Sequence, residues 1–132
     1  AGLRAPEFIK KKAPGSNPGA AADSLQRGRD AFERGDYRAA AVEFESLSKR
    51  DPSNAVSSYW LGRSLLEQGE YAGAVKSFDE AIARQPSMRD AYVQQAAAYE
   101  TMGEKAKAAA ALSRYAEERR KDGITNGKED RR

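Results

Sequence analysis

Pairs of neighbouring carboxylates are the residues of this sequence that could most directly carry acid–base chemistry: Glu43 with Glu45, Asp79 with Glu80, and Glu117 with Glu118. Residues one or two positions apart on a helix do not share a face, so we expect separate, solvated surface charges. The 132-residue chain contains no histidine and no cysteine, which removes the commonest general base and the commonest metal ligands. It also lacks a glycine-rich phosphate loop and a serine-nucleophile motif. We therefore predict that the protein is not an enzyme and binds no metal or cofactor.

The basic excess of the chain lies near its ends. The sequence has 23 Lys and Arg residues against 20 Asp and Glu residues, a net charge of +3. Residues 1–20 carry Arg4 and Lys10–Lys12 against Glu7, whereas residues 21–122 are close to neutral. A neutral body lacks the basic surface of a nucleic-acid-binding domain, which leaves attachment of the N-terminal lysines to nucleic acid or an anionic membrane as a weak alternative. No apolar run reaches 18 residues, so no transmembrane segment is predicted.

Residues 1–20 have the composition of a linker, since they contain three of the five prolines together with three glycines. Their larger apolar residues are Leu3, Phe8 and Ile9. These favour a second interpretation, a short segment that docks on this domain or on a neighbouring molecule. The sequence begins with Ala1 and not with Met, so a piece of a longer protein is one interpretation, and the sequence leaves this open. The compartment therefore stays open, with the cytoplasm favoured.

A 34-residue repeat organises the rest of the chain. The motif of Gly35 and Tyr37 recurs as Gly69 and Tyr71, and a third copy begins at Gly103. At the same shift, Ala40, Phe44 and Pro52 recur as Ala74, Phe78 and Pro86, and the third copy has Ala108 and Leu112. Three units are therefore predicted at 21–54, 55–88 and 89–122, followed by a polar tail over 123–132.

Each unit has the pattern of two helices. The first helices are predicted over 22–34, 54–68 and 88–102, and the second over 37–50, 71–84 and 105–121. Gly35, Gly69 and Gly103 stand just past a helix, where a left-handed residue is needed and glycine adopts it freely. Pro52 and Pro86 end the preceding helix and open the turn to the next unit. A unit this short cannot bury its apolar face alone, so the three units are expected to share one core.

The last helix is expected to end at Asp122–Gly123. One stripe on it is predicted to face the core, made by Ala108, Ala111, Leu112 and Tyr115. Its other faces are small or polar, which is tolerable in water at the end of a stack of repeats. The same surface could pack against a second copy, so self-assembly into a homo-oligomer is an alternative function.

The repeat resembles the tetratricopeptide repeat across residues 21–122. The middle unit matches the family pattern best, through Leu61, Gly62, Leu65, Gly69, Tyr71, Ala74, Phe78, Ala81 and Pro86. The first unit departs at Ser24 and Arg27, and the third at Gln95 and Lys105. The resemblance implies an all-α, right-handed solenoid of three antiparallel helix pairs. It also implies a protein–protein interaction domain that receives a peptide or helix in a concave groove. The alanine-rich third unit favours a bacterial source.

The groove would be lined by one stripe on each first helix, spaced three, four and three residues apart. The candidate partner-binding residues are Leu25, Arg29 and Phe32 in the first unit; Val56, Tyr59, Trp60, Arg63 and Leu66 in the second; and Val93, Ala97 and Glu100 in the third. The stripe of the first unit begins at Ala22, and that of the third unit begins at Asp90. Aromatic and arginine side chains are frequent binding hot spots, so we expect a partner with apolar anchors and one or two carboxylates.

Trp60 has two interpretations, either packing between helices or an exposed anchor at the groove rim. A subgroup of the family grips chaperone tails with a Lys–Asn clamp. Here those positions hold Leu25, Arg29, Trp60, Asp90 and Gln94, so the resemblance does not favour a co-chaperone role. A secretion chaperone is a further alternative, because a class of these resembles three such repeats.

Overall fold

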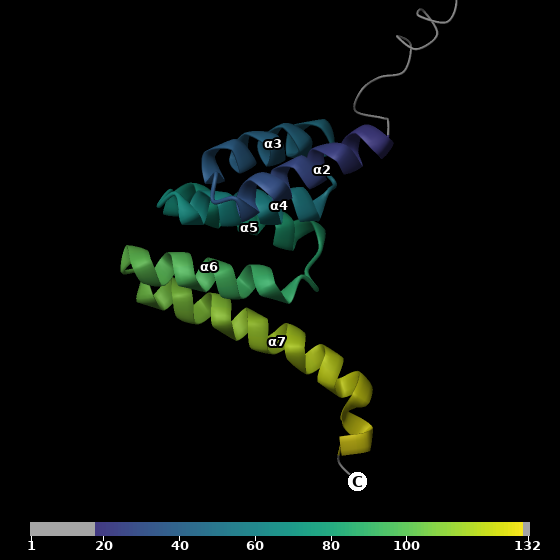
Figure 1. Ribbon diagram of the computed structural model, residues 1–132. Coiled ribbons are helices and arrows are strands. Elements are labelled where there is room, and N and C mark those ends of the chain that lie inside the picture. The colour runs from purple at the N-terminus through teal and green to yellow at the C-terminus, as the bar shows by residue number, and fades with distance from the viewer. Residues whose placement is uncertain (1–17, 131–132) are drawn as a thin grey trace, which may run out of the picture.

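The computed structural model describes residues 18–130, and these form α-helices with no strand (Figure 1). The helices are α2 (Pro18–Glu33), α3 (Tyr37–Arg50), α4 (Ala55–Glu67), α5 (Tyr71–Arg84), α6 (Arg89–Met102) and α7 (Lys105–Asp130). Each helix packs on the next in the chain, and α4 also contacts both α2 and α6. Figure 1 shows the three helix pairs stacked one upon another. The predicted all-α architecture of three helix pairs is confirmed.

Glycine ends the first helix of each pair, as predicted. Gly35, Gly69 and Gly103 have φ of +84°, +82° and +82°, the left-handed conformation that side chains with a Cβ avoid. At Gly69, its own N–H and that of Glu70 donate to the carbonyls of Leu66 and Leu65, at 3.0 and 2.8 Å. These bonds satisfy carbonyls that the end of α4 would otherwise leave unpaired.

A buried phenylalanine against a glycine holds each of the first two pairs together. Phe44 of α3 and Phe78 of α5 are fully buried. A Cβ on Gly28 or Gly62 would stand 2.6 or 2.7 Å from these rings, so only glycine lets the paired helices approach this closely. Gly62 and the fully buried Ala74 are thus small residues at the α4–α5 contact.

Both ends of the helical region extend beyond their predicted limits. Helix α2 begins at Pro18, so residues 18–20 belong to the helix and not to the linker; residues 1–17 lie outside the described residues. The prediction that Asp122–Gly123 ends the last helix is wrong, because α7 continues to Asp130. Gly123 has no positive φ, and a helical glycine costs only about 1 kcal/mol relative to alanine. An Arg89–Asp122 ion pair of 2.7 Å joins α6 to this part of α7.

The core-facing stripe of α7 is narrower than predicted. Ala108 and Ala111 are buried, and Tyr115 packs against the cluster around Phe78 and Tyr92. Leu112 is 44% exposed, which corrects its assignment to the core. It lies about 40° around the helix from the buried Ala108 and about 100° from Ala111, so it stands at the edge of the buried face. No helix among residues 18–130 combines the length and apolar content needed to cross a membrane.

Candidate protein-interaction surface

The predicted stripes lie on α2, α4 and α6, the first helices of the three pairs, which contact one another through α4. Their residues differ in burial. The exposed members are Ala22, Arg29, Val56, Asp90, Ala97 and Glu100, and the half-buried members are Leu25, Phe32, Tyr59, Trp60, Arg63, Leu66 and Val93. Leu25 and Leu66 pack against the core clusters around Phe44 and Phe78, so part of the stripe serves the fold.

Trp60 joins the first two repeats through its ring contacts. Its ring stacks on Phe44 with a centroid distance of 5.9 Å and an interplanar angle of 24°. It meets Phe32 and Tyr59 edge to face, at 5.3 and 5.7 Å. Of the two interpretations of Trp60, packing between helices is therefore the one that these contacts support. Its indole remains half-buried.

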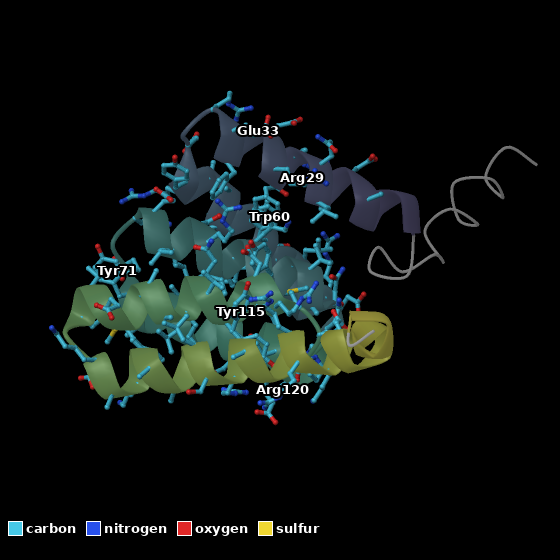
Figure 2. All side chains as sticks on the ribbon, turned by 90° about the horizontal axis from the view of Figure 1, so that it is seen from below. Arg29, Glu33, Trp60, Tyr71, Tyr115 and Arg120 are labelled. Atoms are coloured by element: carbon cyan, nitrogen blue, oxygen red, sulfur yellow. The ribbon has the colours of Figure 1, made fainter. Side chains whose placement is uncertain are left out.

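Two arginines lie over these rings. The guanidinium of Arg63 is 4.9 Å from the Phe32 centroid and 5.2 Å from that of Trp60. Arg29 of α2 lies 5.7 Å from the Trp60 ring, and the two residues are neighbours in Figure 2. Within the described part of the chain, neither arginine forms an ion pair. We call Arg29, Phe32, Tyr59, Trp60 and Arg63 the aromatic–arginine cluster. In this cluster, two guanidinium groups lie next to aromatic rings, and neither is paired with a carboxylate of residues 18–130.

Tyr59 links the second repeat to the third. Its hydroxyl donates a hydrogen bond to the carboxylate of Asp90 on α6. Burial, and then this hydrogen bond and the negative charge of Asp90, raise the pKa of Tyr59 to about 12, against a smaller opposing effect of Arg63. Tyr59 therefore stays protonated at neutral pH. The stripe pattern placed Tyr59 and Asp90 on the same side of the molecule, but it did not predict their bond.

The third repeat contributes a different kind of surface. Val93 is half-buried, and Ala97 and Glu100 are exposed, so α6 offers small and acidic groups. Among the stripe residues, the aromatic and basic side chains lie on α2 and α4. The structure thus brings together the predicted residues of the first two stripes, whereas the third extends the surface without such a cluster.

A hollow of about 540 Å³ lies elsewhere, between α5, α6 and α7, and sequence reasoning missed it. Ile82, Pro86 and Tyr92 form part of its wall, and Arg114 lies 5.1 Å from the Tyr92 ring. The Tyr92 hydroxyl donates to the Pro86 carbonyl at 2.9 Å. No residue of the three stripes lines this hollow. A hollow between three helices depends on how successive pairs are stacked, which the repeat pattern does not specify.

A comparison of the sequence with known protein families identifies the same repeats as the structure. The tetratricopeptide repeat pattern matches twice, over residues 25–87 and 59–123. The chain belongs to the tetratricopeptide repeat family. The two matches overlap on the middle unit, which is also the unit whose residues resemble the family pattern most closely. None of the curated proteins matches the chain.

Solved tetratricopeptide repeat proteins share this fold. MamA superposes with a TM-score of 0.76 at 22% identity, over 79% of this chain and 61% of the MamA chain. The translocator chaperone SycD of Yersinia enterocolitica type III secretion gives 0.76 at 18% identity, over 87% of both chains. The TPR2B domain of yeast Sti1, solved in a complex with pHsp70, gives 0.73 at 24% identity, over 81% and 83%. The match thus spans less than two thirds of MamA, and these identities establish the fold alone.

Proposed function

We propose that this tetratricopeptide repeat protein is a non-enzymatic interaction module that binds a peptide or helical segment of a partner on α2 and α4. The observation that carries the proposal is the aromatic–arginine cluster, with two guanidinium groups that have no carboxylate partner within residues 18–130. The family supports a role as a protein-interaction scaffold. The Sti1 domain, seen in complex with pHsp70, gives further support.

The chemistry of the cluster defines the partner. A guanidinium over aromatic rings keeps its N–H edges free for a carboxylate, to which arginine can donate two parallel hydrogen bonds. The half-buried rings of Phe32 and Trp60 offer apolar area for a neighbouring anchor. Because Arg63 is already held by three rings, binding orders fewer side-chain rotamers than it would for a free arginine. A segment with an apolar side chain next to an acidic one therefore fits best.

Affinity capture from an extract of the source cells tests this proposal. The variant is Arg29→Glu/Arg63→Glu, and the matched control is Arg38→Glu/Lys76→Glu, which makes the same change in charge on exposed positions of α3 and α5. We avoid Tyr59 because its ring packs near Phe78 and its hydroxyl bonds Asp90, so its loss would disturb the fold.

We expect the wild type and the control to capture the same protein and the Arg29/Arg63 variant to lose it, with equal helicity by circular dichroism. Equal capture by all three proteins, or capture of nothing besides the chain itself, would overturn the proposal.

Self-assembly through the last helix pair is a second candidate function. Met102 of α6 and Leu112 of α7 are exposed apolar side chains, at 41% and 44%. SycD, which shares the fold, has been crystallised as a dimer. Sedimentation analysis of a Leu112→Glu variant tests this candidate. A wild-type dimer that becomes monomeric supports it, and a monomeric wild type at all concentrations rejects it.

A further inference from the structure

We propose that the aromatic–arginine cluster binds a phosphorylated side chain of its partner segment, with one phosphate group held by both Arg29 and Arg63. The inference rests on the proposed function and narrows the acidic group of the partner to a phosphate. It depends on the way the two guanidinium groups converge, on the charges around them, and on the number of oxygens that an anion can offer them.

The two guanidinium groups reach towards each other's helix. Arg29 extends from α2 to the Trp60 ring on α4, at 5.7 Å. Arg63 extends from α4 to the Phe32 ring on α2, at 4.9 Å, and also lies 5.2 Å from the Trp60 centroid. Phe44 stacks on one face of the indole, which leaves the other face for the arginines. With both groups over that one face, a single anion placed between them can contact both.

The carboxylates around the cluster leave both arginines without a paired counter-ion. Glu33 and Glu67 stand one helical turn beyond the two arginines, but neither forms an ion pair with them in the described part of the chain. The carboxylate of Asp90 accepts the hydrogen bond of the Tyr59 hydroxyl, so it offsets the nearby positive charge from a distance without pairing with it. Because the two guanidinium groups repel each other over one indole, an anion between them relieves this repulsion.

A phosphate monoester fits this arrangement better than a single carboxylate. A carboxylate that accepts two parallel hydrogen bonds from one arginine has used both of its oxygens on that arginine. A phosphate monoester offers three acceptor oxygens and carries a charge near −2 at neutral pH, so it can accept from two guanidinium groups at once. The half-buried rings of Phe32 and Trp60 offer apolar area to the residue beside it. The partner segment therefore has a phosphorylated residue next to an apolar one.

An NMR titration of the full chain tests the proposal, because Trp60 is the only tryptophan and gives a single indole N–H signal within the cluster. The probes are the capped peptides Leu-phosphoserine-Leu and Leu-Glu-Leu, and inorganic phosphate. We expect the phosphopeptide to shift the Trp60 signal and to bind at least about tenfold more tightly than the other two probes. Equally tight binding of Leu-Glu-Leu or of inorganic phosphate, or no shift of the Trp60 signal, would overturn the proposal.

Single substitutions separate a shared phosphate from a contact with one arginine. Arg29→Gln and Arg63→Gln should each weaken phosphopeptide binding by about tenfold or more. Arg38→Gln, the matched control at an exposed position of α3, should leave it unchanged. Asp90→Asn should tighten it, because it removes a negative charge and keeps an oxygen that accepts the Tyr59 hydroxyl. Full binding after the loss of either arginine of the cluster would contradict a shared phosphate.

The pH dependence of binding reports the charge of the phosphate. A phosphate monoester gains its second negative charge with a pKa of about 6. The ionisable groups next to the arginines are carboxyl groups and phenols, namely Glu33, Tyr37, Tyr59, Glu67 and Asp90. The chain has no histidine, the side chain that ordinarily changes charge in this range. We expect phosphopeptide binding to tighten by about tenfold from pH 5 to pH 7.5. A flat profile would count against the proposal.

The capture experiment separates a failure of this inference from a failure of the proposed function. Phosphatase treatment of the extract should abolish capture by the wild type. Capture that survives the phosphatase but is lost with the Arg29/Arg63 variant would overturn the phosphate and leave the proposed function standing. The titrations use synthetic peptides, so equal capture by the wild type and the variant would contradict the proposed function without changing their result.

Discussion

Ser58 is the buried hydroxyl that the fold leaves without a partner. It lies on α4 with 1% of its surface exposed, and its Oγ has no hydrogen bond in the described structure. The matching position of the first repeat, Ser24, accepts hydrogen bonds from Arg27 and Arg50 at 3.0 and 2.8 Å. The two serines thus occupy the same position of the repeat, but only the hydroxyl of Ser24 is hydrogen-bonded.

We predict that Ser58→Ala leaves the protein equally stable or up to about 1 kcal/mol more stable. The Ser58 hydroxyl loses its hydrogen bonds to water on folding and gains none in the protein, so its removal relieves that cost. Ser24→Ala should instead lower the free energy of unfolding by about 1 kcal/mol, because it removes a paired hydroxyl. Urea unfolding followed by circular dichroism measures both. A larger loss for Ser58→Ala than for Ser24→Ala would contradict this account.

The raised pKa of Tyr59 predicts a loss of stability in alkali. An unfolded tyrosine ionises near pH 10, whereas Tyr59 in the folded protein stays protonated to about pH 12. Between these values the unfolded state binds fewer protons than the folded state, so stability falls as pH rises and is unaffected below about pH 10. Burial raises the pKa of Tyr92 as well, in the same direction. We therefore expect Tyr59→Phe to weaken this pH dependence without abolishing it, as measured by urea midpoints from pH 8 to 12.

The residue types of the candidate site could be predicted from the sequence, but their contacts could not. Helical spacing placed Phe32, Tyr59 and Arg63 on the same side of successive first helices, where the structure has them in contact. The bond from Tyr59 to Asp90 spans 31 residues and depends on the angle between the second and third pairs. A repeat pattern fixes which face a residue occupies and leaves that angle open.

At the scale of the helix pair, glycine decides how closely two helices pack. A Cβ on Gly62 would stand 2.7 Å from the buried Phe78 ring, but one on Gly73 of α5 would meet only the mobile end of Leu65, at 3.3 Å. We predict that Gly62→Ala destabilises the protein by about 1–3 kcal/mol through overpacking. Gly73→Ala should be neutral or gain up to about 1 kcal/mol from helix propensity. Thermal unfolding measures both, and equal effects of the two substitutions would show that the close approach at Gly62 is not limiting.

Helix ends were predictable from glycine at three positions but not at a fourth. Gly35, Gly69 and Gly103 have positive φ, and the predicted ends of the first helices lie within two residues of the observed ones. At Gly123 the same residue type sits inside α7. A glycine permits a helix to end but does not require it, and the Arg89–Asp122 ion pair lies just before it. The exposure of Leu112 was likewise not predictable from the pattern. Its helix, α7, is the last of the stack and has a neighbouring helix on one side only.

At the scale of the whole molecule, stability is distributed along the stack. One apolar cluster surrounds Phe44 in the first pair, a second surrounds Phe78 and reaches Tyr92, and a third lies between Ala96 and Ala108 in the last pair. The main helix contacts join neighbours in the chain, apart from those of α4 with α2 and α6. In such an array each repeat is stabilised by itself and by its neighbours, so damage is expected to stay local.

Phe44→Ala tests this distribution, because the side chain is fully buried in the first pair and its truncation costs about 3–5 kcal/mol in a packed core. Trp60 would lose the ring on which it stacks, so the damage should reach α4. We expect amide hydrogen exchange to accelerate strongly in α2 and α3, moderately in α4, and not at all in α6 and α7. The aromatic–arginine cluster would then be lost while the third repeat stays folded. Uniform acceleration over all helices would instead show that the repeats unfold as one cooperative unit. In that case, a partner bound on α2 and α4 would stabilise α7 as much as it stabilises α2 and α4.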